Sequence, residues 1–325
     1  MTYLNHRVIY HKSKQMKAII LTEAGKNFGL GHLSRCVALK NHLTKADFEV
    51  EIYNRGDYKS DFAHNYDWLQ KLDLVGNGAD LIVIDSYYTQ YEYYEYALKN
   101  ARICVVIDDF SRIKYPKKVI VLNPALNAKR LYIDTENELF AGVEYGLLRE
   151  EFNIREDKKI HKNIENVLIV LGGNDVQNNT QKVLDITQKE LSYAKIDVVL
   201  PRYYEPLDYG FDVNIYANLK ASEVKKLMLE ADLVISGGGV TTIEVQSTRT
   251  PSIALEIAQN QSYQLRQWQK IGLRIAQNPF QLKGLIKSLV KFKDRNKVYN
   301  ALSKIYIGGE IPRFVEMLQK RIKGI

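Results

Sequence analysis

The chain has 325 residues, of which 46% are hydrophobic and 10% aromatic. This length exceeds the usual range for one domain and the apolar content suffices for two cores, so we expect two domains. No apolar run approaches the roughly 18 residues of a membrane-spanning helix, and residues 1–15 lack the apolar core of a signal peptide. These features predict a cytoplasmic protein without stable membrane insertion.

The formal net charge is +8, but the Lys and Arg residues are scattered and alternate with Asp and Glu, as in residues 283–297. This pattern favours a solvated basic surface over a nucleic-acid track. A mild positive field also attracts small anions, including a diphosphate. Cys36 and Cys104 form no CxxC pair, so we expect buried, reduced thiols without a metal. We therefore expect neither a nucleic-acid partner nor a cofactor.

Short apolar runs separated by helix-like segments dominate the first half of the chain. The first run begins at Met16, and we interpret residues 1–15 as an extension or an upstream start. Alternation of this kind is typical of βαβ units and a mostly parallel sheet. We expect strands at residues 17–22, 48–53, 81–84, 103–107 and 119–122.

The second half repeats this organisation after a charged, weakly periodic segment at residues 153–166. A helix is expected at 221–230, and strands at 167–171, 195–200, 214–216, 233–236 and 252–255. The predicted fold class is therefore α/β, with two Rossmann-like domains facing across a cleft. We expect an N-terminal domain at 16–152, a linker at 153–166 and a C-terminal domain at 167–325.

Polar residues follow four predicted strands of the first half, at 25–32, 85–88, 108–109 and 123–127. Ligands of open parallel sheets bind beyond the carboxyl ends of the strands, so these ends predict a polar cleft. Asp108 and Asp109 are candidates for a metal site, but adjacent strand residues point to opposite faces, which disfavours shared ligation.

A glycine-rich turn at residues 29–32 (Gly-Leu-Gly-His) leads into a helix expected at 33–43. His32 would lie at the helix N-terminus, where the macrodipole disfavours imidazolium, and a neutral imidazole can take a proton from water. An equally weighted alternative is that His32 only caps the helix. The turn is not a dinucleotide fingerprint, because Ser34 stands where the third glycine is required.

Two loops of the second half resemble a nucleotide site. Residues 172–175 (Gly-Gly-Asn-Asp) follow one strand, and 237–239 (Gly-Gly-Gly) follow another and precede Thr241 and Thr242. Amides and hydroxyls at a helix start bind phosphate oxygens, and Glu244, about one turn further, would accept from ribose hydroxyls. No Gly-Lys-Ser/Thr follows, so this is not a Walker loop. A tight strand-to-helix turn remains the alternative for the glycines, and ordinary turn chemistry for Asn260 and Gln261.

These loops, in this order, resemble the UDP-2,4-diacetamido-2,4,6-trideoxy-β-L-altropyranose hydrolase family of pseudaminic acid biosynthesis, a relative of the glycosyltransferase-B (GT-B) superfamily. Members release UDP from that nucleotide sugar. The matching stretches are residues 29–35, 81–87, 106–109, 122–124, 142–152, 171–175, 231–236 and 260–261. Members typically carry His before the tyrosine of the Asp-x-Tyr motif, whereas this chain has Ser86.

The resemblance implies that His32 and Tyr87 lie at the sugar, that no metal is required, and that the C-terminal helix packs back on the first domain. It implies that the glycine-rich loops line UDP and that Glu244 binds the ribose. The candidate substrate-binding residues are Gly29, Gly31, Arg35, Asp85, Asn123, Gly173, Asn174, Asp175, Ser236, Gly237, Gly238, Gly239, Glu244, Asn260 and Gln261. We favour a monomer.

The chemistry expected from these residues is hydrolysis of a UDP-sugar with inversion. UDP is a good leaving group, so a single base that activates water suffices and the second carboxylate of ordinary glycosidases is dispensable. Neutral His32 would be that base, Tyr87 would hold the sugar or the water, and glycine amides would stabilise charge on the diphosphate. The alternatives are a GT-B glycosyltransferase that uses the same donor and a non-catalytic nucleotide-sugar sensor.

Overall fold

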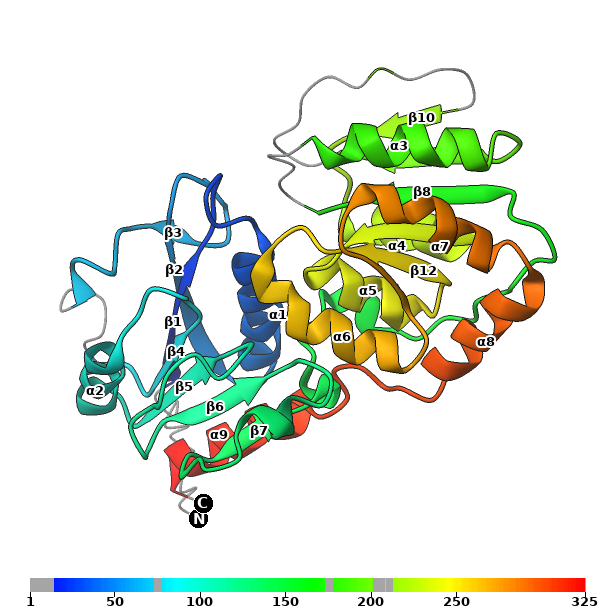
Figure 1. Ribbon diagram of the computed structural model, residues 1–325. Coiled ribbons are helices and arrows are strands. Elements are labelled where there is room, and N and C mark those ends of the chain that lie inside the picture. Colours follow the sequence, from blue (N-terminus) through cyan, green and yellow to red (C-terminus); the bar gives the residue numbers. More distant parts are fainter. Residues whose placement is uncertain (1–14, 73–77, 173–177, 201–207, 209–212, 325) are drawn as a thin grey trace, which may run out of the picture.

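The computed structural model describes residues 15–72, 78–172, 178–200, 208 and 213–324, and its first half is built on one parallel sheet (Figure 1). Among these residues, seven strands lie in the order β3-β2-β1-β4-β5-β6-β7. Helices α1 (Gly31–Lys45) and α2 (Tyr91–Asn100) are among the connections. The strands are β1 (Met16–Glu23), β2 (Phe48–Arg55), β3 (His64–Asn65), β4 (Leu81–Ile84), β5 (Ile103–Ile107), β6 (Ile120–Asn123) and β7 (Leu139–Ala141).

The second half holds another parallel sheet, with six strands in its described part in the order β10-β9-β8-β11-β12-β13. These strands are β8 (Asn166–Val170), β9 (Lys195–Val199), β10 (Val213–Tyr216), β11 (Leu233–Gly237), β12 (Ser252–Leu255) and β13 (Arg274–Ala276). The helices of this half are α3 (Asn179–Glu190), α4 (Ala221–Glu230), α5 (Val240–Thr248), α6 (Ser262–Lys270), α7 (Leu282–Leu289) and α8 (Phe292–Leu302).

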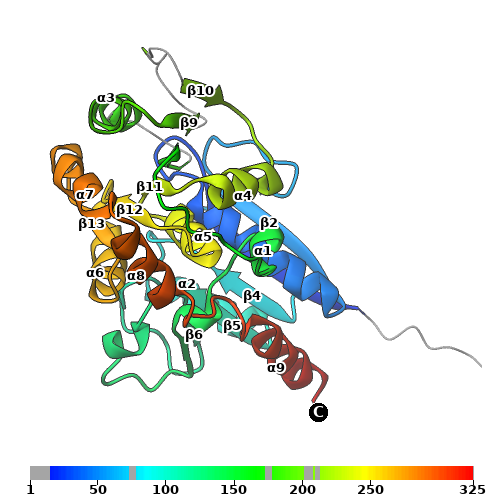
Figure 2. The same cartoon turned by 90° about the vertical axis from the view of Figure 1, so that its right-hand side faces the viewer.

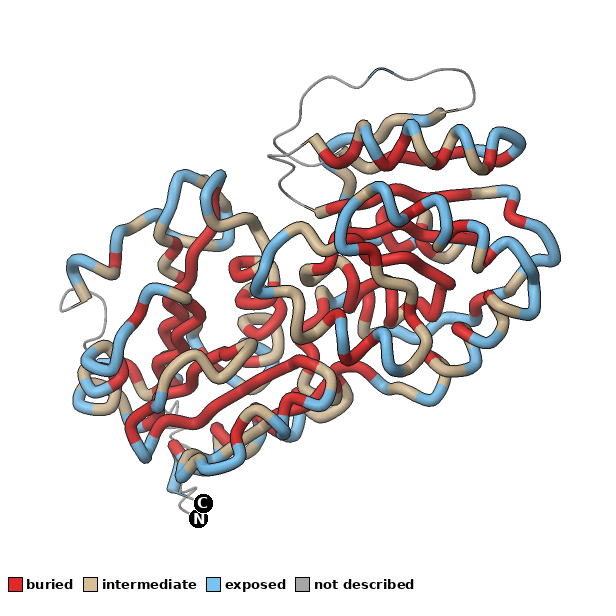
Figure 3. Tube along the Cα trace, in the orientation of Figure 1, coloured by how far each residue is buried: buried red, intermediate tan, exposed pale blue. Residues whose placement is uncertain are grey.

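Burial on both faces explains why the central strands are continuous apolar runs. All residues of β4 and β5 are buried, as expected for a parallel sheet covered by helices on both sides (Figure 3). In β1, Ala18 and Ile20 pack into the core on one face of the sheet, and Ile19 and Leu21 into the core on the other. A separate core surrounds the second sheet. The predicted α/β class with two Rossmann-like halves is therefore confirmed.

The last helix, α9 (Ile311–Lys323), packs against the first sheet and not the second (Figure 2). Phe314 and Leu318 lie in the core of the first domain, and the Phe314 ring centroid is 4.8 Å from that of Phe140. Arg102 of the first domain donates to the carbonyl of Ile322 at 2.8 Å. The chain thus returns at its end to the domain in which it began.

The two passages of the chain between the domains lie side by side. The Gly308 amide donates to the carbonyl of Val143 at 3.0 Å, and the Glu310 amide to the carbonyl of Glu144 at 2.9 Å. A Cβ atom on Gly146 would lie 2.6 Å from a methyl carbon of Ile307. Glycine at position 146 therefore allows the two passages to approach each other closely.

The segment predicted as a linker, residues 153–166, is packed on the second domain. Lys158 is buried, and its Nζ donates to the carbonyls of Leu229 at 2.6 Å and Ala231 at 2.5 Å, at the C-terminus of α4. Burial lowers the pKa of Lys158 to about 8. Arg295 donates to the carbonyl of His161 at 2.8 Å. These bonds anchor the segment to the second domain, so it is not a free tether between the halves.

Candidate active site

The carboxyl ends of the strands bring together the loops that the sequence singled out. In the first sheet β1 lies beside β4, so the turn that leads to His32 lies next to the segment that begins at Asp85. In the second sheet β8 lies beside β11, which places Gly172 next to the loop that begins at Gly238. Both positions are topological switch points, where the crossovers on the two sides leave room for a ligand.

His32 is held by a buried carboxylate. It is 8% exposed, and its Nδ1 lies 2.6 Å from Oδ1 of Asp85, which is 0% exposed. Helix α1 has Leu30 at its N-cap position without a side-chain capping bond. Capping, the alternative reading of His32, is therefore wrong, because its side chain pairs with Asp85.

Arg35, one turn further along α1, keeps Asp85 ionised. Its Nη2 and Nε donate to the two Asp85 oxygens at 2.6 and 2.7 Å. Burial raises the pKa of Asp85, but Arg35 and His32 together lower it by more, so the pKa lies well below its usual range. An ionised carboxylate can only accept, so Nδ1 of His32 carries a proton toward Asp85, and in a neutral imidazole the lone pair is then on Nε2. Arg35 Nη2, 3.2 Å from Nδ1, is then a close neighbour and not its hydrogen-bond partner.

Asp109 completes this cluster. The sequence placed it at a polar strand end and offered it as a candidate metal ligand. Asp109 accepts from Arg35 at 2.7 and 3.0 Å and from the hydroxyl of Tyr87. The Tyr87 ring meets the His32 ring edge-on, with centroids 4.5 Å apart. Burial and the charge of Asp109 raise the pKa of Tyr87 well above its ordinary value, so the phenol stays protonated. We call His32, Arg35, Asp85, Tyr87 and Asp109 the histidine cluster.

The adjacent carboxylate, Asp108, belongs to a different network. It accepts from the Tyr132 hydroxyl at 2.7 Å, and Tyr132 accepts from the amide of Asn123 at 3.0 Å. Asn123 is fully buried, and its side-chain oxygen accepts from the Ala125 amide at 2.9 Å. Internal bonds thus use both ends of the Asn123 amide, and its predicted contact with substrate stays a prediction. Within the described residues, no group of three or more His, Cys, Asp or Glu could hold a metal ion.

The second domain reaches the first through the start of α5 and the turn that precedes α6, both near α1 (Figure 1). Asn260 donates from its amide nitrogen to the Tyr87 hydroxyl at 3.1 Å. A Cβ atom on Gly31 would lie 3.4 Å from a methyl carbon of Val240, the first residue of α5. Residues proposed for the sugar and residues proposed for the nucleotide therefore meet at one junction between the domains.

The three glycines after β11 have different surroundings. A Cβ atom on Gly237 would lie 2.1 Å from the backbone oxygen of Leu171, and one on Gly238 would lie 2.6 Å from Leu265 and 2.7 Å from Gln261. Among the residues that the structure describes, a Cβ atom on Gly239 would meet only Gln261, at 3.6 Å. The backbone oxygen of Leu171 therefore excludes a side chain at position 237, whereas the atoms nearest to position 238 are the ends of side chains.

Part of the predicted phosphate site is used inside the loop itself. The Gly238 amide donates to the carbonyl of Leu255 at 2.8 Å, and the Thr242 hydroxyl donates to that of Gly237 at 2.6 Å. The hydroxyl of Ser236 is fully buried and has no partner among the described residues. The Thr242 amide donates to the carbonyl of Gly239 at 3.0 Å. The amides of Val240 and Thr241, at the start of α5, remain the donors suited to an anion.

Glu244 lies one turn inside α5, is 3% exposed and is already paired. Its two oxygens accept from Arg149 Nε at 2.6 Å and Nη2 at 2.8 Å. Burial raises the pKa of Glu244, and Arg149 only partly offsets this effect. Arg149 was not among the sequence candidates, although it lies in a matching stretch. A ribose at Glu244 would share this carboxylate with it.

The remaining candidates are spread around the same junction. Gly25 and Gly29 exchange two backbone hydrogen bonds, at 3.0 and 2.8 Å, which close the turn before His32. The side-chain oxygen of Gln261 accepts from the Ile257 amide at 3.0 Å, so it shapes its own loop. Three further candidates, Gly173, Asn174 and Asp175, lie outside the described residues.

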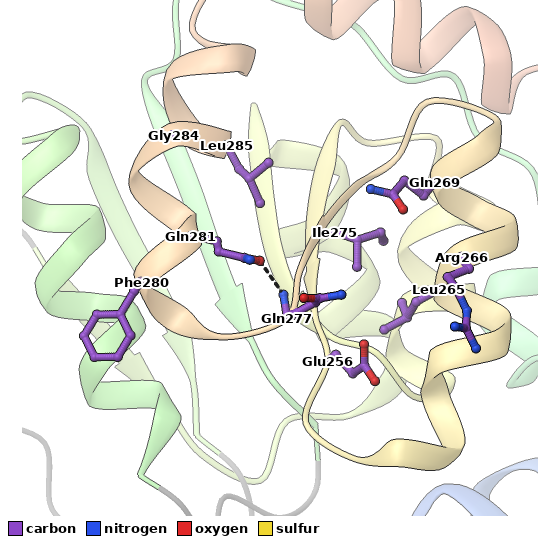
Figure 4. A pocket seen from close by; sticks show the side chains of 10 residues that line it. All are labelled: Glu256, Leu265, Arg266, Gln269, Ile275, Gln277, Phe280, Gln281, Gly284 and Leu285. Carbon is purple, nitrogen blue, oxygen red and sulfur yellow. Dashed lines mark hydrogen bonds between the residues drawn. The ribbon is translucent and has the colours of Figure 1, made fainter.

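A cavity of about 600 Å³ lies apart from the histidine cluster, between α6 and α7 (Figure 4). Leu265, Ile275 and Leu285 contribute apolar side chains to its lining, together with polar side chains such as Arg266 and Gln277. None of its lining residues belongs to the histidine cluster or to the glycine loop. We therefore place the candidate active site at the domain junction and not in this cavity.

Comparison with solved structures identifies the fold as GT-B. A glycotransferase of kitacinnamycin superimposes with a TM-score of 0.64 at 11% identity, covering 95% of this chain and 100% of the other. A putative UDP-N-acetylglucosamine 2-epimerase from Listeria monocytogenes gives 0.61 at 12% identity, covering 96% and 98%. At these identities the likeness establishes the architecture alone.

In sequence, the chain is similar to a pseudaminic acid cytidylyltransferase and UDP-2,4-diacetamido-2,4,6-trideoxy-β-L-altropyranose hydrolase of Helicobacter pylori. Identity is 28% over 265 residues, or 80% of this chain and 48% of that protein. The predicted resemblance is therefore confirmed. The chain spans about half the length of the curated relatives it matches. No known family model matches it. Within the described residues, no helix has both the length and the apolar character to cross a membrane.

Proposed function

We propose that this protein hydrolyses a UDP-activated diacetamido-trideoxyhexose to the free sugar and UDP, with His32 as the base. The observation that carries the proposal is the buried pair of His32 and Asp85, 2.6 Å apart, at the switch point of the first sheet. The protein of Helicobacter pylori to which this chain is similar is named for a hydrolase of such a nucleotide sugar. The substrate class comes from that similarity, and the catalytic role of His32 from the geometry.

The surroundings of His32 suit proton acceptance. Asp85 fixes Nδ1 as the donor, which leaves Nε2 to take a proton from water. The buried group of Arg35, Asp85 and Asp109 carries one more negative than positive charge, because Arg35 lowers the pKa of both carboxyls despite their burial. This excess negative charge lies directly beside His32, the proposed proton acceptor.

In the proposed reaction, a water oxygen forms a bond to the anomeric carbon and gives its proton to Nε2 of His32. The bond from the anomeric carbon to the phosphate oxygen breaks, and its electron pair leaves with UDP. Attack from the side opposite to UDP inverts the configuration. The first amides of α5 would stabilise charge that grows on the diphosphate.

Tyr87 would hold the sugar or the water and would not act as the base. Its phenol is kept protonated, donates to Asp109 and accepts from Asn260. Because Asn260 comes from the second domain, this bond links the proposed sugar side with the proposed nucleotide side. The contacts proposed for Ser236, Gly239 and Glu244 with UDP rest on their places around the second switch point.

The second candidate is a glycosyltransferase that uses the same donor, favoured by the similarity in architecture to a solved glycotransferase. A base at the position of His32 can activate an acceptor hydroxyl as well as water. A non-catalytic sensor would bind the nucleotide sugar without turnover. These three functions differ in what happens to UDP when no acceptor is present.

The first test is UDP release from a panel of UDP-diacetamido-trideoxyhexoses, without acceptor and with and without EDTA. We expect acceptor-independent release by the wild type, and a loss of about 100-fold or more in His32→Ala. His42→Ala is the matched control, because His42 lies on the same helix outside the histidine cluster. Binding without release would reject the hydrolase and favour a transferase or a sensor.

A further inference from the structure

Arg35 joins two carboxylates, and each carboxylate holds one of the side chains proposed to act on the substrate. Asp85, just after β4, accepts from Arg35 at 2.6 and 2.7 Å and lies 2.6 Å from Nδ1 of His32. Asp109, just beyond the neighbouring strand β5, accepts from Arg35 at 2.7 and 3.0 Å and from the hydroxyl of Tyr87. The proposed mechanism uses the first carboxylate and gives the second no role.

The ring of Tyr87 is fixed between two other rings. Its centroid lies 4.5 Å from that of His32, with the ring planes at 80° to each other, and 5.4 Å from that of Phe110, the residue after Asp109. The Tyr87 side chain is nevertheless only half-buried. The phenol is therefore held beside the proposed base while part of it remains open to a ligand.

The direction of each hydrogen bond at the Tyr87 hydroxyl follows from its partners. A phenol has one proton to donate and lone pairs that accept. Burial raises the pKa of Asp109, but Arg35 and His32 together lower it by more, so this carboxyl is ionised and can only accept. The Tyr87 proton is thus donated to Asp109, and the amide nitrogen of Asn260 donates to the phenol oxygen at 3.1 Å. Toward a ligand, Tyr87 can only accept.

An acceptor at this position selects the chemistry of its ligand. Acetamido N–H groups, sugar hydroxyls and water can donate to the Tyr87 oxygen, whereas phosphate and carbonyl oxygens cannot. In the proposed reaction, the sugar and the attacking water both offer such donors. A phenol without a fixed partner could turn its O–H toward an acceptor instead, so the bond to Asp109 decides which kind of group Tyr87 can bind.

We infer that Asp109 is a positioning residue for the proposed hydrolysis, which accepts the only O–H of Tyr87 and thereby presents the phenol oxygen to an N–H or O–H donor of the sugar or the water. The inference rests on the proposed function for its effect on rate. Its structural part, the orientation of the Tyr87 hydroxyl by Asp109, can be measured without any turnover.

A double-variant comparison tests whether Asp109 acts through Tyr87. We expect Asp109→Asn and Tyr87→Phe each to lower kcat/KM for UDP release about 10- to 100-fold, because the acceptor is misdirected in one and lost in the other. The double variant should fall no further than the more impaired single variant, because both changes remove the same interaction. Asp109→Glu keeps the negative charge beside Arg35 but displaces the carboxylate, so it keeps the inference testable if Asp109→Asn fails to fold.

Tyr132→Phe is the matched control for these variants. The Tyr132 hydroxyl donates to the adjacent carboxylate, Asp108, at 2.7 Å, and neither residue belongs to the histidine cluster. The control therefore removes a tyrosine hydroxyl from a buried carboxylate one position away in the chain. Its kcat/KM for UDP release should stay close to that of the wild type.

One measurement does not depend on catalysis. In spectra of protein labelled with ¹³C at the Cζ atom of tyrosine, the Tyr87 signal is assigned with Tyr87→Phe and reports on the hydroxyl directly. We expect this signal to shift in Asp109→Asn and Asp109→Glu and to stay unchanged in Tyr132→Phe. A change of fold stability alone would leave it where it is in the wild type.

Kinetics with the panel of UDP-sugars identify the donor. If it is the attacking water, Tyr87→Phe should lose kcat by the same factor for every sugar. If it is an acetamido group of the sugar, Tyr87→Phe should raise KM for substrates that carry this group and leave KM unchanged for substrates that lack it. Either result supports the inference.

Three results overturn it. If the losses of the two single variants multiply in the double variant, Asp109 acts independently of Tyr87. If the Asp109 variants lose thermal stability but keep wild-type kcat/KM, the carboxylate is merely structural. A Tyr87 signal that does not shift in the Asp109 variants overturns the inference whatever the activity.

The same measurements separate the inference from the proposed function. If the wild type releases no UDP while the Tyr87 signal shifts as expected, the hydrolase proposal fails and the orientation of Tyr87 by Asp109 stands. If the wild type releases UDP and the signal does not shift, the hydrolase proposal stands and the role of Asp109 is wrong.

Discussion

Two buried carboxylates of this protein each accept hydrogen bonds from one arginine through both oxygens, but their pKa values are shifted in opposite directions. Arg35 donates to Asp85 at 2.6 and 2.7 Å, and Arg149 donates to Glu244 at 2.6 and 2.8 Å. The geometry of the two pairs is nearly the same. The pKa of Asp85 nevertheless lies well below its usual range, whereas that of Glu244 is raised.

The number of compensating groups accounts for the difference. Asp85 is stabilised by His32 as well as Arg35, whose side chain is only 8% exposed. Glu244 depends on Arg149 alone among the charged groups that lower its pKa, and that side chain is 31% exposed. A carboxylate whose partners more than offset the cost of burial stays ionised and fixed in position. A carboxylate whose partners only partly offset that cost is stabilised by a further hydrogen-bond donor. These properties suit the orientation of a base at Asp85 and the binding of ligand hydroxyls at Glu244.

The largest expected effect comes from removing the charge of Asp85. Asp85→Asn no longer forces the proton onto Nδ1 of His32, so we expect kcat for UDP release to fall roughly 1,000-fold or more with little change in KM. Single-turnover measurement of UDP release checks this. Asp80→Asn, just before the opposite end of β4, is the matched control, because its oxygen accepts from the Lys17 amide and an asparagine oxygen can do the same. A variant that keeps a tenth of wild-type kcat would refute this role of Asp85.

A smaller effect, on binding, is expected at the other carboxylate. Glu244→Gln should raise KM for the UDP-sugar about 10- to 100-fold, because a charge-assisted hydrogen bond to a ribose hydroxyl is weakened, while kcat stays within about threefold. Glu230→Gln on α4, where Glu230 is exposed and pairs with Lys226, is the control. If the KM of Glu244→Gln matches that of the control, Glu244 serves only to bind Arg149 and the ribose contact is wrong.

The elements around both pairs could be predicted because apolar runs in a parallel sheet leave a strong local signal. The strand before Asp85 and the helix that carries His32 were expected within a few residues of where they lie. In contrast, β3, β7 and β13 have only two or three residues each, too few for a periodic pattern. The packing of residues 153–166 on the second domain also escaped prediction, because charged segments usually lie in solvent.

The partners of the two carboxylates could not be derived in the same way. Asp85 and Arg35 are 50 positions apart in the sequence, and Glu244 and Arg149 are 95 apart, so no local spacing connects them. Asp109 was visible at a strand end, but its sequence context did not distinguish an arginine partner from a metal ion. Strand order and tertiary contacts decide these pairings, and neither can be read from residue spacing.

The smallest expected effect is on the pH dependence of stability, and it has opposite signs for the two carboxylates. The pKa of Asp85 is lower in the folded protein than its ordinary value of 3.8. Its ionised form therefore stabilises the fold at pH values above 3.8, and this contribution is lost as the pH falls below 3.8. A raised pKa gives a contribution that is complete below the ordinary value of 4.5 for Glu244 and is lost as the pH rises through the folded-state pKa. The carboxylates should therefore respond differently between pH 4.5 and neutrality.

Thermal unfolding of wild type, Asp85→Asn and Glu244→Gln at a series of pH values checks this contrast. As the pH rises from 4.5, the Tm of the wild type should fall relative to that of Glu244→Gln. We expect about 2 to 4 °C for each kcal/mol of folding stability that the wild type loses. The difference between wild type and Asp85→Asn should stay constant over the same interval and shrink only below about pH 4. Parallel profiles for the two variants would mean that the second arginine pair is as fully compensated as the first, and the contrast between the two carboxylates would then be wrong.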